Sequence, residues 1–228
     1  MRYRLDNHCR LAVKAYTAHE NILSARFNLI YMNQYLIATI GFLSYGTLLG
    51  ILEVLSRRFS LPAEYIRRIS HISAAIFVAF FSLYLSAPFL LIILTIFILI
   101  MLLSRFLKIF NHIHSVARRT IGEELLPLGF IATYLISNGE TAIFIPAVLV
   151  VGLADPITGI VVQKYKNNVF GIFTFMVVTI AILLLSSKLS PLAIIVISLL
   201  VAITERLSPY GSDNLSMPVL TTLLLRYI

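Results

Sequence analysis

The sequence contains little cysteine and little charge, and its apolar stretches leave no room for a soluble domain of useful size. Cys9 is the single cysteine among 228 residues, which excludes an internal disulfide framework. No Cys/His spacing typical of a metal site is present either. Charged residues make up 12% of the chain, hydrophobic residues make up 59%, and the mean hydropathy is +0.94. Soluble domains average roughly 45–50% apolar residues, so the composition predicts an integral membrane protein.

The net charge of +8 does not indicate a nucleic-acid partner, because the chain has no soluble surface that could hold one. In a protein with several membrane spans, a basic balance reports topology and attraction to anionic lipid. The oligomeric state leaves no signal in the sequence.

Seven apolar runs are long enough to predict transmembrane helices, and an eighth is short. They lie at residues 36–55, 69–86, 88–104, 121–137, 141–163, 170–187, 190–204 and, for the short one, 215–225. Because a helix crosses the bilayer with about 20 residues, we expect an all-α, polytopic membrane protein with seven or eight transmembrane helices. Residues 1–34 predict an N-terminal amphipathic segment, followed by a single transmembrane domain at 35–228.

Basic residues are distributed unequally between the two sets of predicted loops. The loops 56–68, 105–120, 164–169 and 205–214 contain eleven Lys and Arg, whereas the opposite loops and the C-terminus contain Lys188 and Arg226 alone. Cytosolic loops are enriched in Lys and Arg, so the first set is predicted to be cytosolic. The five bases of the N-terminal tail would then lie outside, but only Arg26 is close to the first span.

One predicted span carries an acid inside its apolar run. Asp155 precedes the polar Gln163 by eight residues, which places it about 12 Å below that helix end. An ionised group at such depth is costly unless a cation or a donor meets it. Pro156 removes a backbone donor and predicts a kink in the helix. The stretch therefore predicts a site for a cation and an anionic group.

The other costly polar residues fall at the same predicted cytosolic ends. They are Arg67, Arg68, His71, Glu123, Glu124, Lys164, Lys166, Glu205, Asp213 and Asn214. Carboxylates and bases in one layer favour a divalent cation bound with a polyphosphate, since Mg²⁺ takes one or two carboxylates plus phosphate oxygens. Each residue also has a structural interpretation: topology charges for the arginines, a hydrogen-bonded structural residue for His71, and a helix start for the two glutamates.

Four segments, in order, resemble a known family. They are Arg67-Arg68-Ile-Ser-His71, Arg119-Thr-Ile-Gly-Glu-Glu-Leu-Leu-Pro127-Leu-Gly129, Ala154-Asp-Pro-Ile-Thr-Gly159 and Glu205-Arg-Leu-Ser-Pro209-Tyr-Gly211-Ser-Asp-Asn214-Leu-Ser-Met-Pro218. The sequence is similar here to the CTP-dependent lipid-alcohol kinases, the family of phytol kinase, dolichol kinase and the CTP-using diacylglycerol kinase. It departs from the family at Ser73-Ala74-Ala75, where a glycine is usual, and at Lys166-Asn-Asn-Val-Phe-Gly171, which lacks a hydroxyl and an acid.

The resemblance implies a kinase that transfers a phosphoryl group from CTP to a lipid alcohol, with Mg²⁺ as cofactor. It implies that Asp155 and Asp213 hold the metal, with Glu123 or Glu124 nearby. The implied nucleotide- and phosphate-binding residues are Arg67, Arg68, Lys164, Lys166 and Asn214. His71 would act as a base or an orienting group near the lipid hydroxyl, so that the implied catalytic set is Asp155, His71 and Asp213.

Two other functions remain open from the sequence. A cytidylyltransferase that forms a CDP-lipid would use a similar cation and nucleotide site and would release pyrophosphate. A transporter of a small ion or solute is the second alternative, because an acid at a broken helix also marks such sites.

Overall fold

The computed structural model describes residues 32–107 and 121–228, which form a bundle of helices without a strand. The predicted amphipathic segment lies outside the described residues except for 32–34, which belong to the first described helix. The helices are Met32–Phe59, α2 (Ala63–Phe81), α3 (Ala87–Leu107), α5 (Gly122–Ile136), α6 (Thr141–Leu149), a π-helical turn (η1, Val150–Ala154), α7 (Asp155–Tyr165), α8 (Asn168–Ser186), α9 (Pro191–Leu207) and α10 (Asp213–Tyr227). Each of the eight apolar runs is a helix, so the predicted all-α class is confirmed.

Helix starts follow from local sequence signals. Asn167 precedes α8, and its side chain accepts a hydrogen bond from the backbone N–H of Val169 at 2.8 Å. Ser190 does the same for the Ala193 N–H before α9, and Pro191 occupies the first turn. Such residues satisfy backbone donors that have no partner inside the helix.

Within residues 32–107 and 121–228, four helices are long and apolar enough to cross a membrane. They are Met32–Phe59, Ala87–Leu107, Thr141–Tyr165, which joins α6, η1 and α7, and Asn168–Ser186. Large apolar side chains lie exposed along the bundle, for example Leu185 on α8 and Leu192 on α9. A soluble monomer rarely leaves so much apolar surface in contact with water. The chain is therefore a membrane protein.

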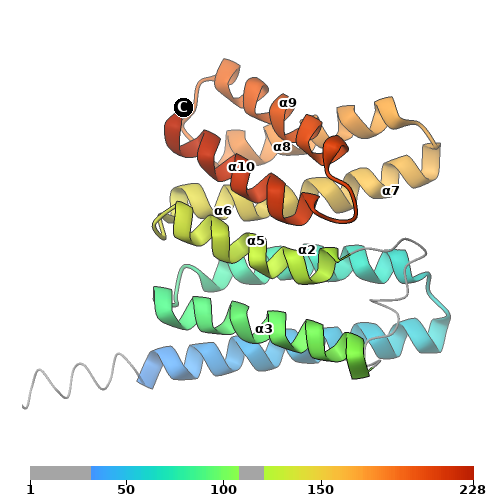
Figure 1. Ribbon diagram of the computed structural model, residues 1–228, viewed down its shortest axis with the longest axis vertical. Helices are drawn as coiled ribbons and strands as arrows, with labels where there is room; N and C mark the ends of the chain where they lie inside the picture. The colour runs from blue at the N-terminus through green and yellow to red at the C-terminus, as the bar shows by residue number, and fades with distance from the viewer. Residues whose placement is uncertain (1–31, 108–120) are drawn as a thin grey trace, which may run out of the picture.

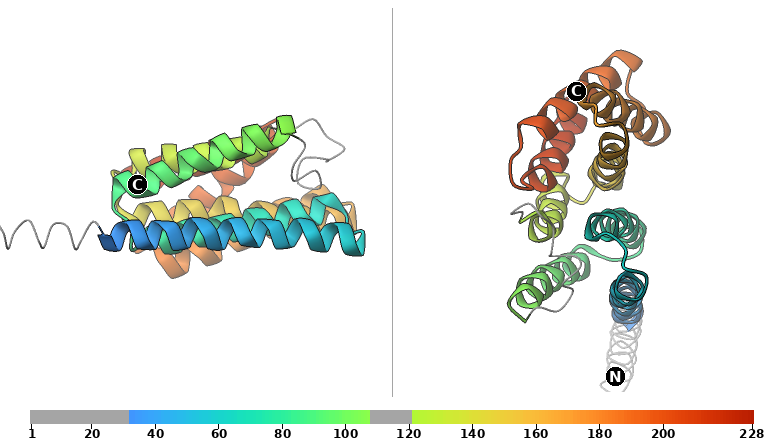
Figure 2. Two further views of the ribbon diagram at one scale, coloured as in Figure 1. Left: turned by 90° about the horizontal axis from the view of Figure 1, so that it is seen from below. Right: turned by 90° about the vertical axis from the view of Figure 1, so that its right-hand side faces the viewer.

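The helices run side by side, so their ends gather at two opposite ends of the bundle (Figures 1 and 2). The loop 60–62, the start of α5 and the α7–α8 and α9–α10 connections lie at the right-hand end in Figure 1. The described residues of the loops that were predicted to share one side of the membrane thus lie at one end of the bundle. We call it the charged end.

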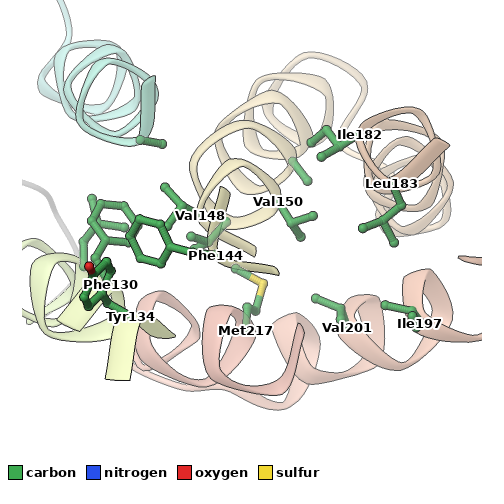
Figure 3. Packing of buried hydrophobic residues seen from close by; sticks show 14 of the residues in the cluster. Phe130, Tyr134, Phe144, Val148, Val150, Ile182, Leu183, Ile197, Val201 and Met217 are labelled. Carbon is green, nitrogen blue, oxygen red and sulfur yellow. The ribbon is translucent and has the colours of Figure 1, made fainter. Parts of the chain in front are cut away.

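The core surrounds the long helix of α6, η1 and α7. Phe144, Val148 and Val150 are fully buried and face Met217 of α10 and Leu183 of α8 (Figure 3). A helix that is apolar on all its faces is usually buried, and this one lies in the middle of the bundle. This helix is packed against α2, α8 and α10.

Small residues allow two close helix contacts. A Cβ on Gly152 would collide with the Cβ of Ala75, which lies on α2. A Cβ on Gly129 of α5 would collide with the backbone oxygen of Asn214 at the start of α10. Small residues at such positions let helix backbones approach closely in membrane proteins. These two contacts fix α2 and α10 against the segments that carry the site described below.

Candidate functional site

The predicted helix break is a π-helical turn inside a continuous helix. Pro156 lacks an N–H, and in an α-helix its ring would collide with the carbonyl of Gly152, four residues earlier. The turn Val150–Ala154 widens at this point, and α7 resumes at Asp155. Single π-helical turns of this kind occur frequently at functional sites. The turn places Asp155 at the wall of a cleft.

This cleft lies at the charged end and has a volume of about 640 Å³, within the usual range of roughly 300–1,000 Å³ for ligand pockets. We call it the charged cleft. Its walls come from α2, α7, the end of α9, the α9–α10 loop and the start of α10. Its charged lining residues are Glu64, Arg67, Arg68, Asp155, Glu205, Arg206 and Asp213.

Two arginines of α2 share one carboxylate in the charged cleft. The Nη2 atoms of Arg67 and Arg68 donate to Oε1 of Glu64 at 2.9 and 3.0 Å. Arg68 Nη1 also donates to Oε1 of Gln163 at 2.8 Å. Arg67 Nε is buried and has no hydrogen-bond partner among the described residues. Guanidinium groups suit phosphate recognition, but four carboxylates line the cleft against three arginines, so an anion would bind there together with a cation.

A glycine makes room for one of these guanidinium groups. A Cβ on Gly159 of α7 would lie 3.0 Å from Nε, Cζ and Nη2 of Arg68. The guanidinium therefore lies directly against the α7 backbone, one turn after Asp155. Thr158, the neighbouring residue, lines the same cleft, and its buried hydroxyl oxygen has no hydrogen-bond partner within residues 32–107 and 121–228.

Asp155, at the start of α7, and Asp213, at the start of α10, both line the charged cleft. Asp213 is the first residue of α10 and follows a turn in which Tyr210 and Gly211 have φ values of 56° and 87°. The charges that act most strongly on Asp155 include those of Asp213 and Arg67. In the described part of the chain, no group of three or more metal-ligating side chains comes together. Two carboxylates nevertheless fit Mg²⁺, which completes its shell with phosphate oxygens and water.

The structure separates Glu123 and Glu124 from these two aspartates. Both glutamates are buried at the start of α5, and neither lines the charged cleft. Arg105 at the end of α3 lies 3.2 Å from Glu123 Oε2 and 3.0 Å from Glu124 Oε1. The four carboxylates predicted as one metal set are thus divided between two places.

Three further predicted residues lie outside the lining of the charged cleft. Asn214 is buried, and its Nδ2 donates to the carbonyl of Gly122 at 2.8 Å, which ties α10 to α5. Lys164 and Lys166 are exposed at the end of α7. Lys164 Nζ lies 5.3 Å from the ring centre of Tyr165.

An apolar groove begins one turn further along α2 than Arg67, on the same face of that helix. It is formed between Met32–Phe59, α2, α3 and α5, and its volume is about 80 Å³. His71 and Glu123 line it among otherwise mostly apolar residues. The imidazole of His71 is buried, and its Nε2 has no hydrogen-bond partner among the described residues. We call this the apolar groove.

The two sites approach each other along α2. Arg67 lines the charged cleft and His71, four residues later, lines the apolar groove. The charges of Arg67, Glu123 and Glu64 all act on His71. A helix turn advances about 5.4 Å, so a lining residue of the charged cleft and one of the apolar groove lie one turn apart on α2.

The sequence reasoning missed several residues of the site. Glu64 could have been found, because it precedes Arg67 and Arg68 by three and four residues, the spacing of helix ion pairs. Gln163 could not, since it is separated from Arg68 by 95 residues along the chain. Arg105 was counted as a loop charge and instead pairs with Glu123 and Glu124.

The comparisons with known proteins add no relative. No protein-family model, no curated protein and no solved structure matches this chain.

Proposed function

We propose that the protein is a membrane-embedded kinase of the CTP-dependent lipid-alcohol type, which transfers a phosphoryl group from a nucleotide to a lipid alcohol. The observation that carries the proposal is the junction on α2, where Arg67 lines a charged cleft and His71 lines an apolar groove. A reaction between a polyphosphate and a lipid needs one site of each kind, open to each other at the reacting atoms.

The charged cleft binds and orients the polyphosphate. Arg67 and Arg68 pair with phosphate oxygens, and Gln163 and Glu64 hold the Arg68 guanidinium in place. Asp155 and Asp213 would hold Mg²⁺, which supplies charge neutralisation at the phosphates when it is bound. Phosphoryl transfer depends mostly on positioning and electrostatic stabilisation, which such a cleft provides.

The lipid alcohol lies in the apolar groove, and its hydroxyl group attacks the phosphate that is bound in the charged cleft. Its oxygen forms a bond to the γ-phosphorus, the bond from that phosphorus to the bridging oxygen breaks, and the nucleoside diphosphate leaves. The hydroxyl proton passes to Nε2 of His71. A buried imidazole nitrogen that has no hydrogen-bond partner among the described residues is suited to accept it.

The site faces the cytosol in this proposal, and α2, α5, α9 and α10 cross the membrane beside the four candidate spans named above. A cysteine at Ser60, Lys166 or Ser208, in a chain whose Cys9 is replaced by serine, tests the orientation. Labelling by a membrane-impermeant reagent should occur only after the cytosolic face is opened. A cysteine at Lys188, at the other end, should show the reverse, and the opposite pattern would contradict the assignment.

Radiolabel transfer tests the reaction directly. The purified protein in detergent is given γ-labelled CTP or ATP with Mg²⁺ and, in turn, phytol, polyprenol, farnesol and diacylglycerol. We expect labelled lipid phosphate and nucleoside diphosphate. Release of pyrophosphate would instead favour a cytidylyltransferase, and solute uptake by proteoliposomes without nucleotide would favour a transporter.

A further inference from the structure

The apolar groove has one polar end and one apolar end. Ser70, His71 and Glu123 line it near the charged end of the bundle, and Gly41 and Phe81 line it at the other. From His71 to Phe81 the groove follows ten residues of α2, which corresponds to about 15 Å. A ligand that enters it therefore has a fixed orientation, with its polar group beside His71.

We infer that the apolar groove binds the hydrocarbon chain of a single-chain alcohol, with the hydroxyl at His71 and the chain running toward Gly41 and Phe81. This inference rests on the proposed kinase function and specifies its substrate class. His71 supplies the polar anchor: a buried polar atom without a hydrogen bond is unfavourable, and a substrate hydroxyl would provide the partner that Nε2 lacks among the described residues.

The small volume of the groove favours one chain over two. Its volume is about 80 Å³, and aromatic rings narrow it from three helices. The Tyr45 ring centre lies 5.2 Å from that of Phe77 and 5.0 Å from that of Phe97, and all three residues line the groove. Rings at these separations pack against one another, so the three aromatic residues form one continuous wall along which a long-chain or isoprenoid alcohol can lie. A diacylglycerol would have to place two chains there.

Two glycines of the helix Met32–Phe59 provide a matched test. A Cβ on Gly41 would lie 2.9 Å from the Phe81 ring, whereas a Cβ on Gly46 would meet nothing within 4 Å. Gly41→Leu therefore closes the far end of the groove, and Gly46→Leu adds the same side chain in open space. The substrates are geraniol, whose short chain ends before Gly41, and phytol, whose longer chain passes it.

We expect Gly41→Leu to lower kcat/KM for phytol at least tenfold and to change that for geraniol less than twofold. Gly46→Leu should leave both substrates unchanged. Ala74→Leu, which fills the groove one turn from His71, should impair both alcohols and is the second variant if Gly41→Leu does not fold. An unchanged chain-length preference in these variants, or equal phosphorylation of diacylglycerol and phytol by the unmodified protein, would overturn the inference.

A readout without turnover separates this inference from the proposed reaction. A phytol analogue with a photoreactive diazirine at its tail end is irradiated with the full-length protein in nucleotide-free detergent. Cross-links at Phe81 or Leu85 that disappear in Gly41→Leu would support the groove even if no phosphoryl transfer were detected, an outcome that would contradict the kinase proposal alone. Cross-links confined to other helices would overturn the groove.

Discussion

The charged cleft and the apolar groove share α2 but are built in different ways. The cleft is wide, with a volume of about 640 Å³ against about 80 Å³ for the groove, and it collects side chains from α2, α7, α9 and α10. The groove lies between the first helix, α2, α3 and α5. The C-terminal half thus provides most of the charged cleft, the N-terminal half provides most of the groove, and α2 is common to both.

The difference shows how a membrane protein can hold a charged surface and an apolar surface near each other. A charged side chain is stabilised in a bilayer protein only where partners or water meet it, so the charges gather in one cleft at one end. The groove needs no such partners, because its walls match the surrounding hydrocarbon. Substitutions in the cleft and in the groove should therefore have separable effects, which the following predictions use.

The largest effect is expected in the charged cleft, from Asp155→Asn. Phosphoryl transfer should fall by at least about 10²–10³-fold, because the variant lacks the charge that a cation needs. The melting temperature in detergent should stay the same or rise, since Arg67 and Arg68 pair with Glu64 and not with Asp155. Transfer assays and thermal unfolding of the one variant measure both quantities.

Glu140→Gln is the control, because it removes a carboxylate that is exposed at the opposite end of the bundle. It should leave activity unchanged. A destabilised Asp155→Asn protein would mean that the carboxylate serves a buried base, since breaking such a pair costs roughly 3–5 kcal/mol. A variant that stays active would show that Asp155 is not part of the site.

The second effect tests the junction between the two regions. His71→Gln should lower kcat by about 10²-fold, the lower limit for loss of a general base, because glutamine cannot take up the hydroxyl proton. The KM for nucleotide should hardly change, since His71 lines the groove and not the cleft. Steady-state kinetics with varied CTP and saturating alcohol separate the two. A raised nucleotide KM with normal kcat would place His71 on the nucleotide side.

A smaller effect should follow from Gly159→Ala. The new methyl group would lie 3.0 Å from the Arg68 guanidinium and displace it from α7. We expect the KM for nucleotide to rise about tenfold, which corresponds to about 1.4 kcal/mol. Gly50→Ala is the matched control, because a Cβ there meets nothing within 4 Å. Equal kinetics for both variants would show that the position of Arg68 does not matter for binding.

The smallest effect is expected outside both regions, from Lys166→Ala. Lys166 is exposed and does not line the charged cleft, although the sequence predicted it as a phosphate ligand. We expect the KM for nucleotide to change less than twofold, with Arg68→Ala assayed in parallel as the comparison. A large increase for Lys166→Ala would extend the binding site beyond the cleft, to the end of α7.

Helix positions were predictable because they depend on local sequence. The run 141–163 predicted the helix Thr141–Tyr165, and Asp155 with Pro156 predicted an irregular turn there. The irregularity takes the form of a π-helical turn directly before Asp155, a form that the sequence did not predict. A proline inside an apolar run predicts that the helical hydrogen-bond pattern is disturbed there. Neighbouring helices decide how the freed backbone groups are accommodated.

Site membership was only partly predictable. The sequence indicated that Arg67, Arg68, Asp155 and Asp213 belong to one layer, and the structure brings all four to one cleft. It also grouped Glu123 and Glu124 with the aspartates, which the structure does not. Loop order places residues at an end of the bundle, but the rotation of each helix decides which cavity a side chain enters.

By itself, then, the sequence determined the class of protein, the helices and the end at which charge collects, because hydropathy and helical periodicity act over short stretches of chain. Tertiary structure decided the pairing of Arg68 with Gln163, the packing of Ala75 against Gly152, and the separation of His71 and Glu123 from the charged cleft. These depend on contacts between residues far apart in the chain. Such contacts are set by the close packing of whole helices, to which each residue contributes only a part.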